Sequence, residues 1–352
     1  MIRIGARSSA LARAQADQVA DALRSHGVQT EYVPIRTQGD VDRRELTQIG
    51  GTGVFAAAVR EQLLDGTIDV AVHSCKDLPT TPVDGLEVIA HPAREDTRDV
   101  LVGLRMDELV DRGRAGSLTI GTGAPRRTVQ LQQLAAERGL DLGCRPIRGN
   151  VETRISLVRD GVVDAVVLAA AGLRRLGLLA AGEESGKTGR QVQIAGLPAE
   201  LLTDDQVLSA PGQAALAIEI RSSLDSENRR VLTRLDDAVT RAEVLAERRF
   251  LAVLEAGCTA PVGARAKVGA RDPGTDLTLA AVLGTTGKVR GQVQLTSALS
   301  EGSPAPGVEG EVSRRGDLIQ VRGQGSAADP VELGSRLAEL VLSTVDLAEI
   351  PR

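Results

Sequence analysis

The chain has 352 residues, enough for two or three domains that each bury an apolar core. Its net charge of −5 argues against a general binder of polyanions. Tyr32, Phe55 and Phe250 are its only aromatic residues, which argues against binding single-stranded nucleic acid by base stacking.

Short β-type runs alternate with helical segments over the first two-thirds of the chain. This alternation predicts an α/β protein with mostly parallel sheets, arranged as two similar lobes with a cleft between them. We expect the hinge near residues 93–98. The expected strands are 2–5, 31–36, 69–73, 86–91, 118–121 and 165–169, and the expected helices are 9–25, 55–64, 126–138 and 151–159.

The last third has a different pattern, which predicts a smaller α+β domain. Between residues 297 and 329 the chain is rich in Gly, Ser, Pro and charge, which favours a loop or hairpin insertion. Helices are expected at 227–235, 240–254 and 330–345, and strands at 264–268, 277–283 and 288–295.

The cysteines, the histidines and the apolar runs argue against several further classes of protein. Cys75, Cys144 and Cys258 form no C-x-x-C pair, and no histidine has metal-ligand spacing with another His or Cys. The chain starts without an apolar signal core, and its longest apolar run, 165–173, is shorter than a membrane span of about 20 residues. We therefore expect a cytoplasmic protein without a metal site, a disulfide scaffold, or a nucleic-acid or membrane partner.

A polar cluster at residues 73–77, HSCKD, directly follows the apolar strand at 69–72. Open α/β sheets bind ligands at the carboxyl ends of their strands. Asp77 is therefore a candidate acid, base or stabiliser of a cation, and Lys76 a candidate ligand for an anion. The alternative is a solvated junction with a surface Lys–Asp pair, which the spacing alone does not exclude.

Arginines recur where predicted strands end and helices begin. Helix N-termini present free N–H groups, and guanidinium forks beside them favour carboxylates or phosphates. Singly, each arginine is an ordinary surface charge. Together, in both lobes, they indicate a small polyanionic ligand in the cleft. The set is Arg7, Arg126, Arg127, Arg148, Arg154 and Arg175.

Two loops carry weaker signals. The stretch 50–53, GGTG, precedes a helix but is no Walker motif, and a plain tight turn explains it. Cys258 lies in the loop 255–261, EAGCTAP, after a long helix. This cysteine is either an exposed, reactive thiol or a small buried apolar residue, and its sequence context permits both.

In combination these motifs resemble those of hydroxymethylbilane synthases, also called porphobilinogen deaminases, over nearly the whole chain. The segments that carry the resemblance are 3–9 (RIGARSS), 50–55 (GGTGVF), 69–79 (DVAVHSCKDLP), 148–154 (RGNVETR), 168–178 (LAAAGLRRLGL), 210–213 (APGQ) and 255–263 (EAGCTAPVG). The resemblance implies two periplasmic-binding-protein-like lobes and a smaller α+β C-terminal domain. We expect lobe 1 at 1–95 and 208–222, lobe 2 at 96–207 and the C-terminal domain at 223–352.

The resemblance also implies the chemistry. The family condenses four porphobilinogen molecules head to tail and releases ammonia, on a dipyrromethane cofactor held by thioether, here on Cys258. Asp77 matches the catalytic carboxylate, which stabilises an azafulvenium cation and moves protons. Cofactor-side matches are Ser74, Lys76, Arg126, Arg127 and Arg154, and substrate-side matches are Arg7, Ser9, Gln15, Arg148, Arg154 and Arg175. We expect a monomer that hands its product to uroporphyrinogen-III synthase.

The chain departs from the family pattern in four places. Thr52 stands where many members have Lys, and Gly123-Ala124 where many have two serines. Ala214 replaces the last glycine of a Gly-Gln-Gly, and the segment 297–329 is longer than in the shorter members. None of these departures affects Asp77, Cys258 or the arginines.

Two other functions fit parts of the sequence. The first 220 residues alone permit a non-catalytic two-lobed protein that binds a carboxylate ligand. A cysteine-nucleophile acyl transferase would use Cys258 but needs a histidine base, and the three histidines are distant in sequence.

Overall fold

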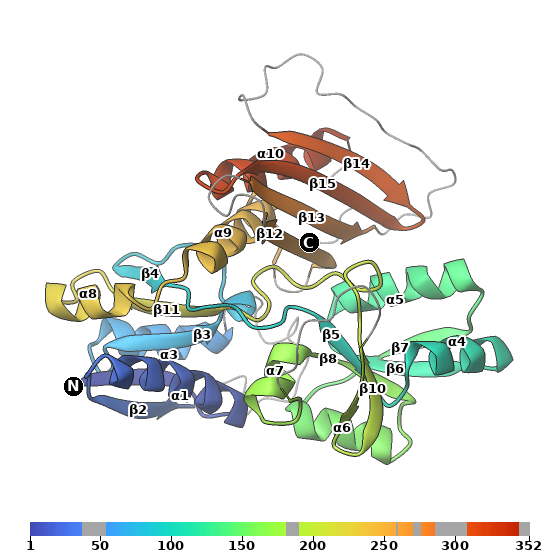
Figure 1. Ribbon diagram of the computed structural model, residues 1–352, viewed down its shortest axis with the longest axis horizontal. Coiled ribbons are helices and arrows are strands. Elements are labelled where there is room, and N and C mark those ends of the chain that lie inside the picture. The colour runs from blue at the N-terminus through green and yellow to red at the C-terminus, as the bar shows by residue number, and fades with distance from the viewer. Residues whose placement is uncertain (37–53, 181–189, 258–259, 270–275, 286–307, 345–352) are drawn as a thin grey trace.

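The computed structural model describes residues 1–36, 54–180, 190–257, 260–269, 276–285 and 308–344. The chain forms two α/β lobes side by side and a C-terminal domain against them (Figure 1). Thr52, Cys258 and the strand expected at 288–295 lie outside the described residues. Within the described part, no helix is long and apolar enough to cross a bilayer.

Lobe 1 is a five-stranded sheet in the order β2-β1-β3-β11-β4, with a helix on each face. Val19 and Leu23 of α1 belong to the core on one face, and Val59 of α3 to the core on the other. Ser9 starts α1, because its hydroxyl accepts a hydrogen bond from the Ala12 amide. The elements are β1 (Ile2–Arg7), α1 (Ala10–Ser25), β2 (Thr30–Ile35), α3 (Val54–Leu64), β3 (Val70–Ser74), η1 (Cys75–Asp77), β4 (Leu86–Ala90), β11 (Leu216–Arg221) and α8 (Ser226–Thr233).

Lobe 2 repeats this plan with a six-stranded sheet, β7-β6-β8-β5-β10-β9. Leu109 of α4 and Leu131 of α5 pack on one face, and Ile155 of α6 and Leu173 of α7 on the other. The elements are β5 (Asp99–Val102), α4 (Met106–Ala115), β6 (Leu118–Thr122), α5 (Pro125–Arg138), β7 (Leu142–Pro146), α6 (Val151–Arg159), β8 (Ala165–Ala169), α7 (Ala170–Arg175), β9 (Gln191–Ile194) and β10 (Leu197–Leu201).

The sheets are more mixed than the alternating pattern predicts. In lobe 1, β2, β1 and β3 are parallel, but β11 runs antiparallel to β3 and β4. In lobe 2, β5 runs antiparallel to β8, β10 runs antiparallel to β5, and β9 runs antiparallel to β10. The reason is that the chain crosses twice between the lobes, so β5 and β11 enter their sheets from the hinge rather than through a helical crossover.

The C-terminal domain is an antiparallel sheet, β12-β13-β15-β14, with α9 and α10 packed on one face around Phe250. The expected insertion at 297–329 contains β14 and β15. Their glycines obscure the strand pattern, since a Cβ at Gly310 or Gly323 would lie 2.5–2.6 Å from Leu337 of α10. The elements are α9 (Ala238–Val253), β12 (Val262–Val268), β13 (Asp276–Gly284), β14 (Glu309–Arg315), β15 (Leu318–Ser326) and α10 (Pro330–Thr344).

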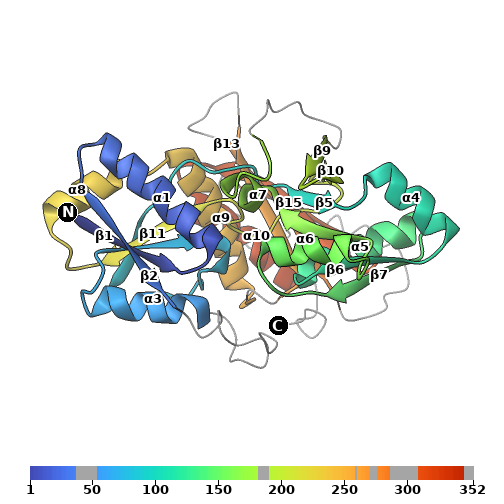
Figure 2. The ribbon, with the colours of Figure 1, turned by 90° about the horizontal axis from the view of Figure 1, so that it is seen from below.

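Two segments, 91–98 and 202–215, join the lobes. Beside these crossings, α1 of lobe 1 and α7 of lobe 2 face each other across the junction (Figures 1 and 2). The helices are close enough that a Cβ at Gly172 would lie 3.7 Å from Leu11. The ends of β3, β6 and β8 come together at this junction, because the segments that follow them all donate hydrogen bonds to residues 213–214 of the second crossing.

Candidate functional site

The candidate site lies where strands of both lobes end. β3 leads into the short η1 turn with Lys76 and Asp77, β6 into α5 with Arg126 and Arg127, and β8 into α7 with Arg175. Carboxyl ends of parallel strands in open α/β sheets form the usual ligand crevice. These five positions, all expected from the sequence, therefore lie at the junction of the lobes.

A buried carboxylate organises the two arginines of α5. Asp99, with no exposed surface, accepts hydrogen bonds from Arg126 Nη1 at 2.8 Å and from Arg127 Nε and Nη2 at 3.0 and 2.7 Å. Burial opposes its ionisation, but the two guanidinium groups hold the pKa of Asp99 well below its usual range. Arg126 and Arg127 are each 4% exposed, so two buried cations share one anion.

Gln213 in the second hinge segment links this cluster to lobe 1. Its Oε1 accepts hydrogen bonds from Arg126 Nη2 at 2.9 Å and from Lys76 Nζ at 3.3 Å. Loss of hydration lowers the pKa of Lys76 to about 8, with Arg127 and Arg126 acting in the same direction and Asp77 opposing them. Lys76, Arg126 and Arg127 therefore form a dense group of cations around Gln213 and Asp99.

Asp77 lies on the open side of this group. It ends η1 and is exposed, whereas Cys75 two residues earlier is fully buried. Asp77 favours the charged form of Arg154, whose pKa is lowered by burial and by the cations Arg127 and Arg148. Arg154 is fixed by a 2.9 Å hydrogen bond from its Nε to Gly149 O. The structure thus brings Asp77 and the arginines of α5 and α6 into one electrostatic environment.

The lobe 1 positions expected on the substrate side lie near the start of α1. Gln15 is buried, and its Nε2 donates to the hydroxyl of Ser74 at 2.8 Å. Ser9 uses its hydroxyl as the N-cap of α1. Arg7 ends β1, and its carbonyl accepts a hydrogen bond from the Tyr32 hydroxyl at 3.0 Å.

Arg175 spans the junction of the lobes. Its Nη2 donates to the Ala214 carbonyl at 2.7 Å, and its Nε donates to Gln18 Oε1 of α1 at 3.4 Å. Burial lowers the pKa of Arg175 to about 10, and the negative charge of Glu95 offsets only part of this effect. Arg175 is thus suited to an anion supplied by a ligand.

The departure at Gly123 has a steric reason. A Cβ at this position would lie 2.7 Å from the Ile147 carbonyl oxygen, closer than real Cβ atoms come. A serine here would require the backbone of the β6–α5 turn or of residue 147 to move. Thr122 supplies a hydroxyl in the same turn, and it accepts a hydrogen bond from the Ala124 amide at 3.2 Å.

The C-terminal domain is anchored to both the hinge and the η1 loop. Glu247 of α9, fully buried, accepts hydrogen bonds from Arg94 Nη1 and Nη2 at 2.8 Å each and from the Gly212 amide at 2.7 Å. Arg248 of α9 donates to the carbonyls of Cys75 and Leu78. Because α9 leads into the loop of Cys258, this loop starts from a fixed base beside Asp77.

Several of these residues escape a reading of the sequence. Asp99, Arg94 and Glu247 act through partners that are distant along the chain. Gln213 stands out in the sequence only as part of the stretch 210–213, whose other residues do not indicate what its side chain does. Asp99, Arg94 and Glu247 act as members of ion pairs, and Gln213 acts through hydrogen bonds. These partners are brought together only by the tertiary structure.

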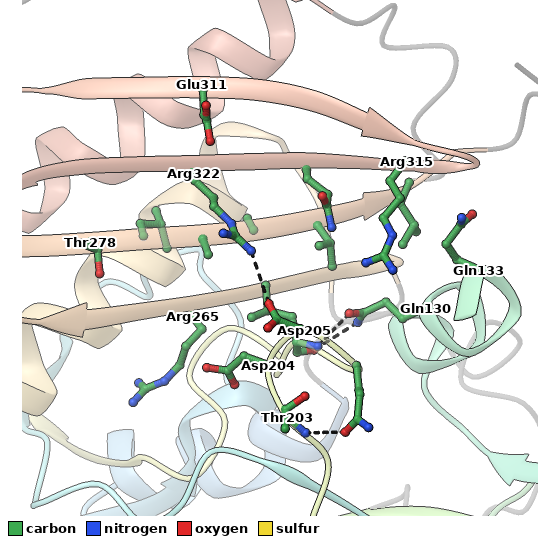
Figure 3. Close-up of a pocket in the computed structure, with 18 of the residues that line it drawn as sticks. Gln130, Gln133, Thr203, Asp204, Asp205, Arg265, Thr278, Glu311, Arg315 and Arg322 are labelled. Atoms are coloured by element: carbon green, nitrogen blue, oxygen red, sulfur yellow. Dashed lines mark hydrogen bonds and ion pairs between the residues drawn. The ribbon is translucent and has the colours of Figure 1, made fainter. Parts of the chain in front are cut away.

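A separate cavity of about 1350 Å³ lies between lobe 2 and the open face of the C-terminal sheet (Figure 3). Ion pairs cross it: Lys267 with Asp204 at 2.6 Å, Arg322 with Asp205 at 3.5 Å, and Arg315 of β14 with Glu137 of α5. We call these three pairs the lobe 2 clasp. In each pair the cation belongs to the C-terminal domain, and the anion lies on α5 of lobe 2 or in the joining segment 202–215 that follows β10 of lobe 2.

Comparisons with known proteins agree over most of the chain. Residues 2–229 match the family model "Porphobilinogen deaminase, dipyromethane cofactor binding domain", and residues 241–303 match "Porphobilinogen deaminase, C-terminal domain". A "Porphobilinogen deaminase 1" of Streptomyces avermitilis is 48% identical over 85% of this chain and 89% of its own. A porphobilinogen deaminase of Thermobifida fusca is 44% identical over 85% and 86%, respectively.

The solved structures to which the chain is similar include the periplasmic aliphatic sulphonate binding protein SsuA of Escherichia coli. It is 11% identical and covers 72% of this chain and 70% of its own, with a TM-score of 0.35. A putative sulfonate-binding protein of Methylobacillus flagellatus gives the same TM-score at 12% identity, over 73% and 72% of the two chains.

Proposed function

The chain belongs to the porphobilinogen deaminase family, and from this premise we propose how its junction site works. The reaction is the deamination and head-to-tail condensation of four porphobilinogen molecules into the linear tetrapyrrole hydroxymethylbilane. The observation that carries the proposal is the excess of cations at the junction. Lys76, Arg126 and Arg127 face one buried carboxylate, Asp99.

The donor set fits the dipyrromethane cofactor of the family. Each pyrrole ring has an acetate and a propionate, so two rings offer four carboxylates, and guanidinium and ammonium groups are their natural partners. When bound, the cofactor supplies a covalently held pyrrole end to which substrate is added. The residues proposed to hold it are Cys258, Ser74, Lys76, Arg126, Arg127 and Arg154.

Cys258 is proposed as the attachment point partly because the two described cysteines are unsuited to it. Burial raises the pKa of Cys75, and it raises the pKa of Cys144 to about 11. Both thiols therefore remain protonated near neutral pH, whereas the thiolate is the nucleophile.

Asp77 is proposed as the catalytic carboxylate. Loss of ammonia from porphobilinogen leaves an azafulvenium cation, and a carboxylate close to the pyrrole N–H stabilises that charge. Its exposure lets it meet a substrate in the cleft, and it can then accept the proton released at the new ring junction. Lys76 and Arg154 keep Asp77 among cations.

The substrate carboxylates are proposed to bind at the lobe edges. Arg175 has donors turned toward the junction, and Arg148 is exposed beside the start of α6. A growing chain adds two carboxylates per ring, so several separate cations are needed to hold it. The proposed substrate-side set is Arg7, Ser9, Gln15, Arg148, Arg154 and Arg175.

The proposed domain boundaries are 1–95 with 208–222 for lobe 1, 96–207 for lobe 2 and 223–352 for the C-terminal domain. Leu232 of α8 belongs to the core of lobe 1, which favours moving the last boundary beyond α8. We further propose a cytoplasmic monomer that hands its product to uroporphyrinogen-III synthase.

The decisive experiment is the intact mass of the purified protein beside Cys258→Ser, with Cys144→Ser as the matched control. Wild type and Cys144→Ser should carry two extra pyrrole units, and Cys258→Ser should carry none. An unmodified wild type should gain that mass when porphobilinogen is added. If it gains none, the non-catalytic carboxylate-binding function takes precedence.

A further inference from the structure

The side chain of Gln213 has every polar position used. It is fully buried, and its Oε1 accepts from Lys76 and Arg126, while its Nε2 donates to the Thr97 carbonyl at 2.7 Å and to Asp99 Oδ1 at 2.8 Å. An amide has two acceptor sites and two donors, so this amide is saturated. Its orientation is thereby fixed, with the oxygen toward the cations and the nitrogen toward the acceptors.

The backbone of Gln213 is held as firmly as its side chain. Its amide donates to the Ala210 carbonyl at 2.9 Å, and its carbonyl accepts from Arg94 Nε at 2.9 Å. Arg94 in turn is paired with Glu247 of the C-terminal domain. Gln213 is therefore a fixed point between lobe 1, lobe 2 and the domain that carries the Cys258 loop.

The charge balance explains why a neutral group stands here. Within the described part of the chain, Lys76, Arg126 and Arg127 outnumber Asp99 by two positive charges, and the more open pair of Arg154 and Asp77 adds no net charge. A glutamate at 213 would have nearly the same shape but would cancel part of this excess. Bringing several cations together in a buried place is costly unless each also has a hydrogen-bond acceptor.

We propose that Gln213 is a positioning residue that holds Lys76 and Arg126 side by side while leaving their charge for the carboxylates of a pyrrole ligand. It spans the lobes as an uncharged acceptor, so it adds no negative charge that would compete with the carboxylates of a ligand. This inference rests on the proposed function for the identity of the ligand. The arrangement of Gln213 and Lys76 is tested separately from it.

The first test measures the lysines directly. Competitive labelling with acetic anhydride across pH, read by peptide mass spectrometry, reports the pKa of each lysine. Gln213→Glu should raise the pKa of Lys76 by about one pH unit or more, and Gln213→Met should lower it because the acceptor is lost. Lys267, which is exposed and paired with Asp204 rather than with Gln213, serves as the internal reference.

The second test measures loading, as the rate at which protein made without porphobilinogen gains two pyrrole units when porphobilinogen is added. Gln213→Glu should load about tenfold more slowly or worse. Gln206→Glu is the charge-matched control, since Gln206 Oε1 accepts from the Thr203 amide, which a carboxylate also does. It should load like wild type.

The outcomes separate the two proposals. If the pKa of Lys76 is the same in both Gln213 variants, or if Gln213→Glu loads as fast as Gln206→Glu, the inference is overturned. If wild type does not load at all, the proposed function fails, while the labelling still decides the role of Gln213. If Gln213→Glu does not fold, the fall in the pKa of Lys76 in Gln213→Met decides it.

Discussion

Asp77 and Lys76 are neighbours in the η1 turn with different tasks, and single substitutions separate them. Asp77→Ala should lower kcat by about a hundredfold or more, because a lost acid–base or charge-stabilising group costs at least that much. The free energy of unfolding should change by less than about 0.5 kcal/mol, since the side chain is exposed. Steady-state kinetics and urea unfolding measure the two effects.

Asp84→Ala is the matched control for Asp77→Ala, because Asp84 is also exposed and lies in the next loop of lobe 1. It should leave kcat unchanged. A turnover of Asp77→Ala within about tenfold of wild type, equal to about 1.4 kcal/mol of barrier, would remove Asp77 from the catalytic role.

The pKa of Lys76 predicts a pH effect on loading. Its ammonium is present below about pH 8 and is lost above it, so the attraction for carboxylates weakens as the pH rises. The loading rates of wild type and Lys76→Met should therefore differ at pH 7 and converge toward pH 9.5. Taking the ratio of the two rates cancels the effect of cysteine protonation, because both proteins have the same cysteine. A ratio independent of pH would contradict this role.

At the scale of elements, Glu219 of β11 ties α3 to β3. It accepts hydrogen bonds from Arg60 Nη2 at 2.8 Å and contacts His73 Nε2 at 3.1 Å, with 3% of its side chain exposed. Burial opposes ionisation, but these partners lower the pKa of Glu219 to about 2. The pair fixes the strand that leads to Asp77.

Glu219→Gln should lower the free energy of unfolding by about 3 kcal/mol at pH 7, since it leaves Arg60 buried beside a neutral group. A carboxylate with a lowered pKa stabilises the fold fully above its unfolded value of 4.5, and this contribution disappears as the pH falls toward 2. The difference from wild type should thus shrink over that range in denaturant titrations.

The control for Glu219→Gln is Glu87→Gln, which breaks the more exposed ion pair with Arg229. Such pairs contribute about 0–1 kcal/mol. If both substitutions lower the free energy of unfolding by the same amount, burial does not explain the contribution of the Glu219–Arg60 pair.

At the scale of the whole molecule, the C-terminal domain is attached in two ways. The hinge side is the buried Arg94–Glu247 pair, and the lobe 2 side is the clasp of more exposed ion pairs around the cavity (Figure 3). Salt screens exposed pairs much more than buried ones. The domain should therefore stay joined at the hinge while its distance from lobe 2 varies.

Reversing one charge of the clasp should open this side. Lys267→Glu faces Asp204 with a like charge, so the radius of gyration from small-angle X-ray scattering should increase relative to wild type. Adding Asp204→Lys restores an opposite pair and should restore the wild-type value. In wild type the same increase should appear between about 0.1 and 1 M salt, as the screening length falls from about 10 to 3 Å. An unchanged radius in all cases would show that the clasp does not hold the domain.

The sequence alone determined the α/β lobes, the family and the strand ends at which Lys76, Asp77, Arg126 and Arg127 lie. These follow from local signals: strand and helix periodicity, arginines at strand ends, and the HSCKD stretch. The segment 297–329 was expected as a loop or hairpin insertion. That it supplies two strands of the C-terminal sheet was not predicted, because their glycines serve the close approach of α10, which no local pattern reveals.

Only the tertiary structure decided how the charges are balanced. That Asp99 is shared by Arg126 and Arg127, and that Gln213 joins them to Lys76, depends on segments more than 25 residues apart. The pKa values follow from burial and neighbours, which are not properties of the residue itself. Periodicity specifies elements, but charge pairing is decided where the elements meet.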